Sequence, residues 1–119
     1  FFRERLKLRS GGVFDFDAVS ADHTIAMSIS TSTSRTRTGK YAVGKLMKIR
    51  SDMLFLLMCA ASRKCVVLTD KGMFEQCLKE RDGGRVPPEV EFIHAPLPAE
   101  LAAKLEAAQR VASDEVSPG

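Results

Sequence analysis

The sequence has no long apolar run, and its longest, from Met53 to Ala61, has the length of a buried helix segment. A membrane-spanning helix needs about 18 or more such residues, so none is expected. A basic segment followed by an apolar one, as in a secretory signal, is also missing. These absences predict a cytoplasmic protein that does not associate with a membrane.

Cysteine is scarce, and the three present, Cys59, Cys65 and Cys77, form no C-x-x-C pair. His23 and His94 have no Cys or second His at metal-ligand spacing. An odd number of thiols, two of them in apolar stretches, argues against a disulfide framework and against a zinc site. The thiols are therefore expected to stay reduced, as in an intracellular protein.

The composition, with 45% hydrophobic and 28% charged residues among 119, predicts one globular domain. The net charge of +3 is small, but it is unevenly distributed. Residues 1–50 hold ten Lys and Arg against four Asp and Glu, whereas residues 51–119 hold eight against eleven. This asymmetry indicates either a basic face that meets DNA or RNA phosphates or a solvated surface whose charges happen to cluster.

Three stretches in which polar and apolar residues alternate predict strands at residues 2–9, 13–19 and 24–31. The links between them are short, so the three strands are expected to form an antiparallel meander. In the second strand the phenylalanines and Ala18 lie on one face, and Asp15, Asp17 and Val19 are expected on the other.

The rest of the chain alternates helical and strand patterns. Helices are expected at residues 40–61, 72–81 and from Pro98 to Ala112, and strands at 64–69 and 89–95. The helical crossovers predict parallel strands in the second half of the sheet. The fold class is therefore α/β (α+β), with a mixed sheet on which the helices pack.

We expect this domain to occupy residues 1–112, followed by a frayed tail over 113–119. Because the first residue is not Met, we also expect an N-terminal segment upstream of Phe1. The last helix carries an apolar stripe made of Leu101, Leu105, Ala108 and Ala112, through which the chain could form a homodimer.

The order of a meander, a crossover helix and a further strand resembles the PD-(D/E)xK, or restriction-endonuclease-like, nuclease superfamily. The resemblance covers residues 2–95 as topology and is confined in sequence to the hairpin from Val13 to Ser30. Asp17 stands where the family places its first metal-binding acid, and the (D/E)-x-K position reads Ser28-Ile29-Ser30. In that family two carboxylates hold a divalent cation, usually Mg²⁺, and the lysine helps to activate water.

The two serines supply neither the second carboxylate nor the lysine cation, and a single carboxylate is a poor magnesium site. The resemblance therefore implies a catalytically degenerate domain that associates with nucleic acid. For such a domain we expect no cofactor in preference to a bound Mg²⁺. The alternative is an active Mg²⁺-dependent phosphodiesterase whose groups have migrated. The candidates for migrated groups are Asp15, Glu4, Lys45 and Lys48.

Each candidate residue also has a plainer interpretation. Asp15 and Asp17 alternate with phenylalanines, as on the solvent face of a meander. Ser28 and Ser30 either line a degenerate cleft or belong to the polar face of a strand whose apolar face carries Ile25, Met27 and Ile29. Other polar residues fit simple roles, which are an ion pair for Lys48 and Asp52, a helix cap for Asp70 and a partly buried position for His94.

The polar segment at residues 31–40 contains no apolar side chain. Its cations, Arg35, Arg37 and Lys40, lie among Ser and Thr hydroxyls, a composition that suits contacts to a phosphate backbone. The other interpretation is a flexible connector. Three functions therefore stay open: nucleic-acid association without cleavage, metal-dependent cleavage, and protein interaction alone.

Overall fold

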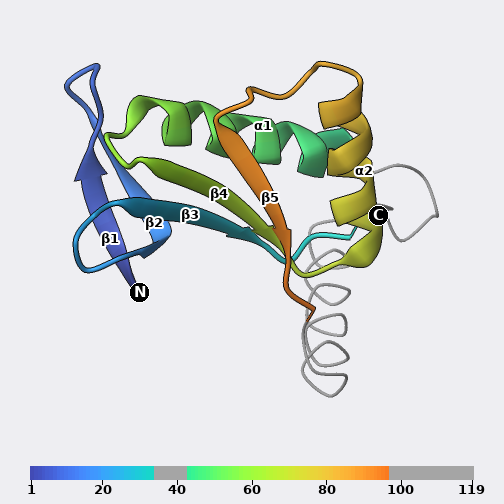
Figure 1. Ribbon diagram of the computed structural model, residues 1–119, viewed down its shortest axis with the longest axis horizontal. Coiled ribbons are helices and arrows are strands. Elements are labelled where there is room, and N and C mark those ends of the chain that lie inside the picture. The colour runs from blue at the N-terminus through green and yellow to red at the C-terminus, as the bar shows by residue number, and fades with distance from the viewer. Residues whose placement is uncertain (34–42, 97–119) are drawn as a thin grey trace, which may run out of the picture.

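The computed structural model describes residues 1–33 and 43–96. In these residues the elements, shown in Figure 1, are β1 (Phe2–Lys7), β2 (Val13–Val19), β3 (Ile25–Ser30), α1 (Val43–Met58), β4 (Arg63–Leu68), α2 (Lys71–Asp82) and β5 (Val90–His94). The predicted order is confirmed over this part of the chain. The expected helix from Pro98, the tail, and the cations Arg35, Arg37 and Lys40 lie outside the described residues.

The strands form one mixed sheet in the order β1-β2-β3-β4-β5. The first three strands pair antiparallel as a meander, and β3, β4 and β5 pair parallel. The predicted α+β class with helices packed on a mixed sheet is therefore confirmed. No helix in the described ranges is long and apolar enough to cross a membrane.

One hydrophobic core lies between the sheet and the two helices. It contains the fully buried Phe16, Leu56 and Leu68, together with Met73 of α2 and Val66 of β4. Figure 1 shows α1 running along one face of the sheet and α2 standing beside β5. This core leaves the cations of β1 on the outer side of the sheet.

The helix ends follow from local hydrogen bonds. Asp70 caps α2 by accepting a hydrogen bond from the Met73 amide at 2.8 Å, which confirms its predicted role. The expected helix over residues 40–61 is too long at its C-terminal end, because α1 ends at Met58. There the Met58 carbonyl accepts from the Arg9 amide of the β1–β2 turn at 2.9 Å, so the hairpin takes over one of the last helical carbonyls.

The predicted face of Val19 is wrong, because this residue is buried at 2% exposure. The register between β1 and β2 shifts between the Phe2–Val19 pair and the Glu4–Phe16 pair. One residue of β1 thus lies opposite two of β2, Asp17 and Ala18, which is the count of a β-bulge. The extra residue returns Val19 to the face that carries Phe16.

The two faces of β3 also differ from the expectation. Ala26 and Ser28 are buried at 0% and 3% exposure, whereas Ile29 on the opposite face is 44% exposed. Small side chains at these two positions allow α1 to pack closely on β3. Ser28 is therefore part of the helix–sheet contact and does not line an open cleft or a solvent face.

The three cysteines are free and buried. Burial raises the pKa of the Cys77 thiol to about 11, and burial with a hydrogen bond to Glu91 raises that of Cys65 to about 11. We expect the native protein to react very slowly with an aromatic disulfide reagent at pH 8, and all three thiols to react at once in denaturant. Rapid reaction of the native protein would contradict this packing.

Candidate functional site

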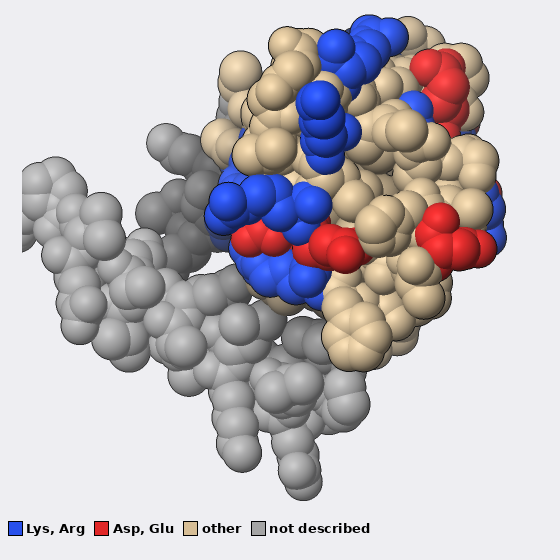
Figure 2. Space-filling model, turned by 90° about the vertical axis from the view of Figure 1, so that its left-hand side faces the viewer, with Lys and Arg blue, Asp and Glu red and all other residues tan. Residues whose placement is uncertain are grey.

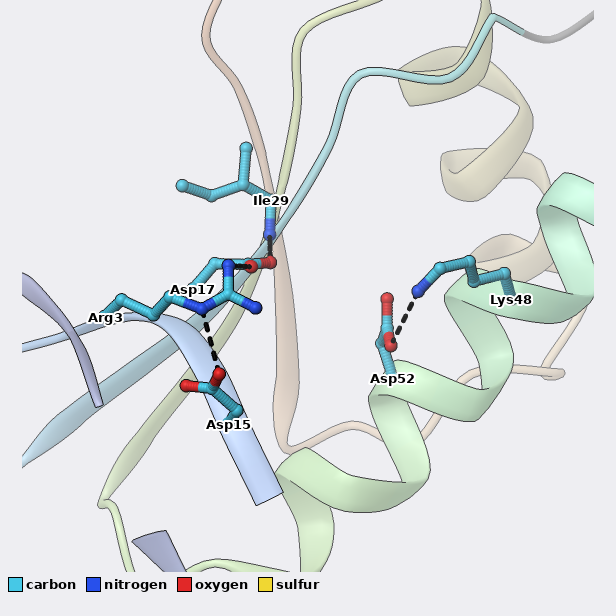
Figure 3. Close-up of polar contacts among 6 residues, drawn as sticks. All are labelled: Arg3, Asp15, Asp17, Ile29, Lys48 and Asp52. Carbon is cyan, nitrogen blue, oxygen red and sulfur yellow. Dashed lines mark hydrogen bonds and ion pairs between the residues drawn. The ribbon is translucent and has the colours of Figure 1, made fainter. Parts of the chain in front are cut away.

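The acidic pair of β2 is bridged by an arginine on the neighbouring strand (Figure 3). The Arg3 Nε lies 3.0 Å from Asp15 Oδ2, and the Arg3 Nη1 lies 3.4 Å from Asp17 Oδ1. The hydrogen bond to Asp15 and the charges of both carboxylates raise the pKa of Arg3. A permanent guanidinium thus lies against the two carboxylates that the sequence singles out as possible metal ligands.

The second oxygen of Asp17 has a backbone partner. The Ile29 amide donates to Asp17 Oδ2 at 2.7 Å, a short, charge-assisted hydrogen bond. The backbone ladder between β2 and β3 pairs Ala18 with Met27 and Val19 with Ala26, next to the bulge. Where the ladder stops, the Asp17 side chain therefore takes the place of a backbone acceptor and holds the two strands together.

A third carboxylate faces this region from α1. Asp52 lies 3.6 Å from Lys48 in the predicted i, i+4 ion pair, which is confirmed, and its side chain is only 15% exposed. Burial is the largest cause of its raised pKa, which Lys48 opposes and the charge of Asp17 reinforces. Figure 3 shows Asp52 on the side of α1 that faces Asp17. The Asp52 carboxylate of α1 is therefore near enough to Asp17 for their charges to interact.

The other predicted site residues are dispersed. Lys45 donates to the Thr33 hydroxyl at 3.4 Å, and His23 Nε2 lies 2.7 Å from Glu4 Oε2. The Ser30 hydroxyl accepts from the Ser32 amide at 3.3 Å at the end of β3. His94 is half-buried on β5, as expected, and its ring stacks on that of Phe74. These contacts fix local structure and do not converge on one point.

Within residues 1–33 and 43–96, no group of three or more His, Cys, Asp or Glu side chains is placed to hold a metal ion. Asp17 and Asp52 are two carboxylates, and the first of them already bonds Arg3 and the Ile29 amide. Magnesium requires several oxygen ligands in near-octahedral geometry. A magnesium site at Asp17 and Asp52 would therefore need oxygen ligands beyond these two carboxylates.

Cations gather on the β1 side of the molecule (Figure 2). Alternation along β1 places Arg3, Arg5 and Lys7 on one side of the strand, and Arg9 follows in the turn. Figure 2 shows a band of Lys and Arg atoms across this face, with acidic atoms beside its lower part. Arg3 is bound to the acidic pair, so the remaining cations are the ones available to a ligand.

We define the basic face as Arg5, Lys7, Arg9 and Lys64. None of the ion pairs among the described residues involves these four side chains. Lys64 Nζ donates to the Leu57 carbonyl at 3.3 Å, next to the β1–β2 turn. The basic first half of the sequence thus corresponds in part to a real concentration of positive charge in space.

Sequence reasoning missed Arg3, Asp52 and Lys64 as members of these sites. The alternation of basic residues in the first strand was a usable signal for the basic face. The approach of Lys64 and Asp52 depends on packing between segments distant in sequence, which no local pattern encodes.

A scan against protein-family models, a search of curated proteins and a search of solved structures each found no match.

Proposed function

We propose that this chain is a nucleic-acid-associated domain that contacts the phosphate backbone through the basic face. The observation that carries the proposal is a set of four cations that form no ion pair with any described residue. Three of them belong to β1 and the turn after it, and Lys64 of β4 lies near that turn. Side chains on alternate residues of a strand are spaced about 7 Å apart. This spacing suits contacts to successive phosphates along one strand of DNA or RNA, which are mainly electrostatic.

The proposal includes a restriction-endonuclease-like core without metal-dependent cleavage. The support for such a core is the order of the elements, in which a meander is followed by a crossover helix and a parallel strand. Asp17 lies on the second strand of the meander. In this chain Arg3 supplies the positive charge beside Asp15 and Asp17 that a divalent cation supplies in that superfamily. Asp17 then serves the strand junction, and nucleic acid is bound without being cut.

The test is the binding of a fluorescent 20-nucleotide single strand and of its duplex, followed by anisotropy at several salt concentrations. If the four cations each neutralise one phosphate of a single strand, the slope of log K against log[salt] is about −3. The affinity would then fall roughly 50-fold between 50 and 200 mM salt. Absence of binding at 20–50 mM salt, about the range in which phosphate contacts are strongest, would refute the proposal.

A second candidate function is a metal-dependent phosphodiesterase, and one observation favours it. Asp52 lies close enough to Asp17 for the charge of one carboxylate to raise the pKa of the other. A divalent cation could relieve this repulsion if Arg3 moved away from Asp17. Mn²⁺ titration with Asp17→Asn as control separates the two candidates: saturable binding and cleavage that the variant loses support the phosphodiesterase.

A further inference from the structure

An open pocket of about 770 Å³ lies at one end of the molecule. It is lined by the β1–β2 turn, the C-terminal end of α1 and the start of β4. Figure 1 shows these three segments together at the β1 end of the molecule. The volume lies within the range of about 300–1,000 Å³ that is usual for small-ligand pockets. Three members of the basic face, Lys7, Arg9 and Lys64, line the pocket, and no acidic side chain from residues 1–33 or 43–96 does.

The side chains that line the pocket are of two chemical kinds. Leu8, Leu57 and Met58 form the apolar part of the lining. The three cations and the exposed Ser10 form its polar part. A purely ionic ligand would use only the second set. A nucleotide carries both a flat, weakly polar base and a phosphate, so it can use both sets at once.

The C-terminal end of α1 can lie next to an anion, although the partial charge of a helix C-terminus is negative. The C-terminus of a helix carries partial negative charge on its free carbonyls, which repels phosphate. Here the Leu57 carbonyl accepts from Lys64 Nζ at 3.3 Å, and the Met58 carbonyl accepts from the Arg9 amide at 2.9 Å. Two of the last carbonyls are thus covered by donors, and the net charge around the pocket is positive.

The turn that forms one wall is itself well defined. The Leu8 amide donates to the Gly12 carbonyl at 2.8 Å, and the Gly11 amide donates to the Leu8 carbonyl at 2.9 Å. Gly11 has φ of +96°, a conformation that favours glycine. Together with the Arg9–Met58 bond, these contacts hold Arg9 and Ser10 against the end of α1.

From this arrangement we propose that the pocket holds one nucleotide of a single strand, with its phosphate on Lys7, Arg9 and Lys64 and its base on Leu57 and Met58. The proposal rests on the proposed function and deepens it, because it names single-stranded nucleic acid as the partner. A strand that follows β1 past Arg5 reaches this pocket at the end of the basic face. A base in a duplex stays stacked and paired, so it cannot enter without being unstacked.

The experiment uses the variants Ser10→Glu and Ser51→Glu of the full chain. Both serines are exposed and both changes add one negative charge, but only Ser10 lines the pocket. With a fluorescent oligo-dT strand, Ser10→Glu should weaken binding about five-fold or more, whereas Ser51→Glu should change it less than about two-fold. A folded Ser10→Glu variant that binds like Ser51→Glu would overturn the pocket proposal.

A second arm tests whether the base contributes. Amide shifts of Ser10, Gly11 and Ala60 should saturate at a lower concentration of thymidine monophosphate than of inorganic phosphate. Equal response to both ligands would show a phosphate site without a base contact and would overturn the nucleotide assignment.

The failures of the two proposals are distinguishable. If oligo-dT binding responds to loss of Arg5 but not to Ser10→Glu, the basic face stands and the pocket does not. If the wild-type chain binds no strand at low salt, both proposals fall together.

Discussion

The double variant Arg5→Gln/Lys7→Gln is expected to bind single-stranded nucleic acid roughly 10- to 50-fold more weakly than the wild type at 50 mM salt. Each substitution removes one phosphate contact, so the salt slope should fall to about half of its wild-type value. Both side chains are exposed and lie on the outer strand of the sheet, so the fold should be retained. Fluorescence anisotropy at a series of salt concentrations measures both effects.

The matched control is Lys71→Gln/Lys79→Gln. These lysines are exposed on α2, which packs beside β5. The strands β5 and β1 form opposite edges of the sheet. The control removes the same net charge, so any effect of overall charge is the same in both variants. Equal loss of affinity in the two variants would mean that binding follows net charge and that the basic face has no special role.

The second large effect is expected for Asp17→Ala, which should lower the free energy of unfolding by about 1–2 kcal/mol. The substitution leaves the Ile29 amide without its 2.7 Å acceptor and removes one of the two carboxylates beside Arg3. In a domain of this size the melting temperature should fall by roughly 5–10 °C. Thermal and urea unfolding followed by circular dichroism measure this change.

Two comparison variants identify the cause of that loss. Asp15→Ala removes only an exposed pair with Arg3 and should cost less than about 1 kcal/mol. Asp17→Asn keeps an oxygen that can accept from the Ile29 amide, so it should recover most of the stability. If Asp17→Ala is no less stable than Asp15→Ala, the structural role assigned to Asp17 is wrong.

The fold was largely predictable from sequence because its elements carry strong local patterns. Alternation marks the meander, and a continuous apolar run marks β4 inside the parallel part of the sheet. The errors arose where tertiary contacts override the local pattern. Val19 changes face because of a bulge, and Ser28 is buried because α1 needs a small neighbour.

The candidate site was less predictable for a related reason. Asp17 is prominent in the sequence, but its partners Arg3 and Ile29 are 14 and 12 residues away and depend on strand register. The sequence predicts only a helix-surface ion pair for Asp52, whereas its proximity to Asp17 requires α1 to lie across the sheet. Lys64 of β4 lies near the other cations only because β4, the end of α1 and the β1–β2 turn line the same pocket.

The central claim is that the basic face of β1 is where nucleic acid binds, and amide chemical-shift mapping tests it most directly. A short oligo-dT strand is added to the isotope-labelled chain at 20 mM salt, and every assigned amide is followed. The account predicts that the largest changes occur at residues 5–11 and 57–64, with little change along α2. Changes centred on α2 or β5, or no changes at all, would contradict it.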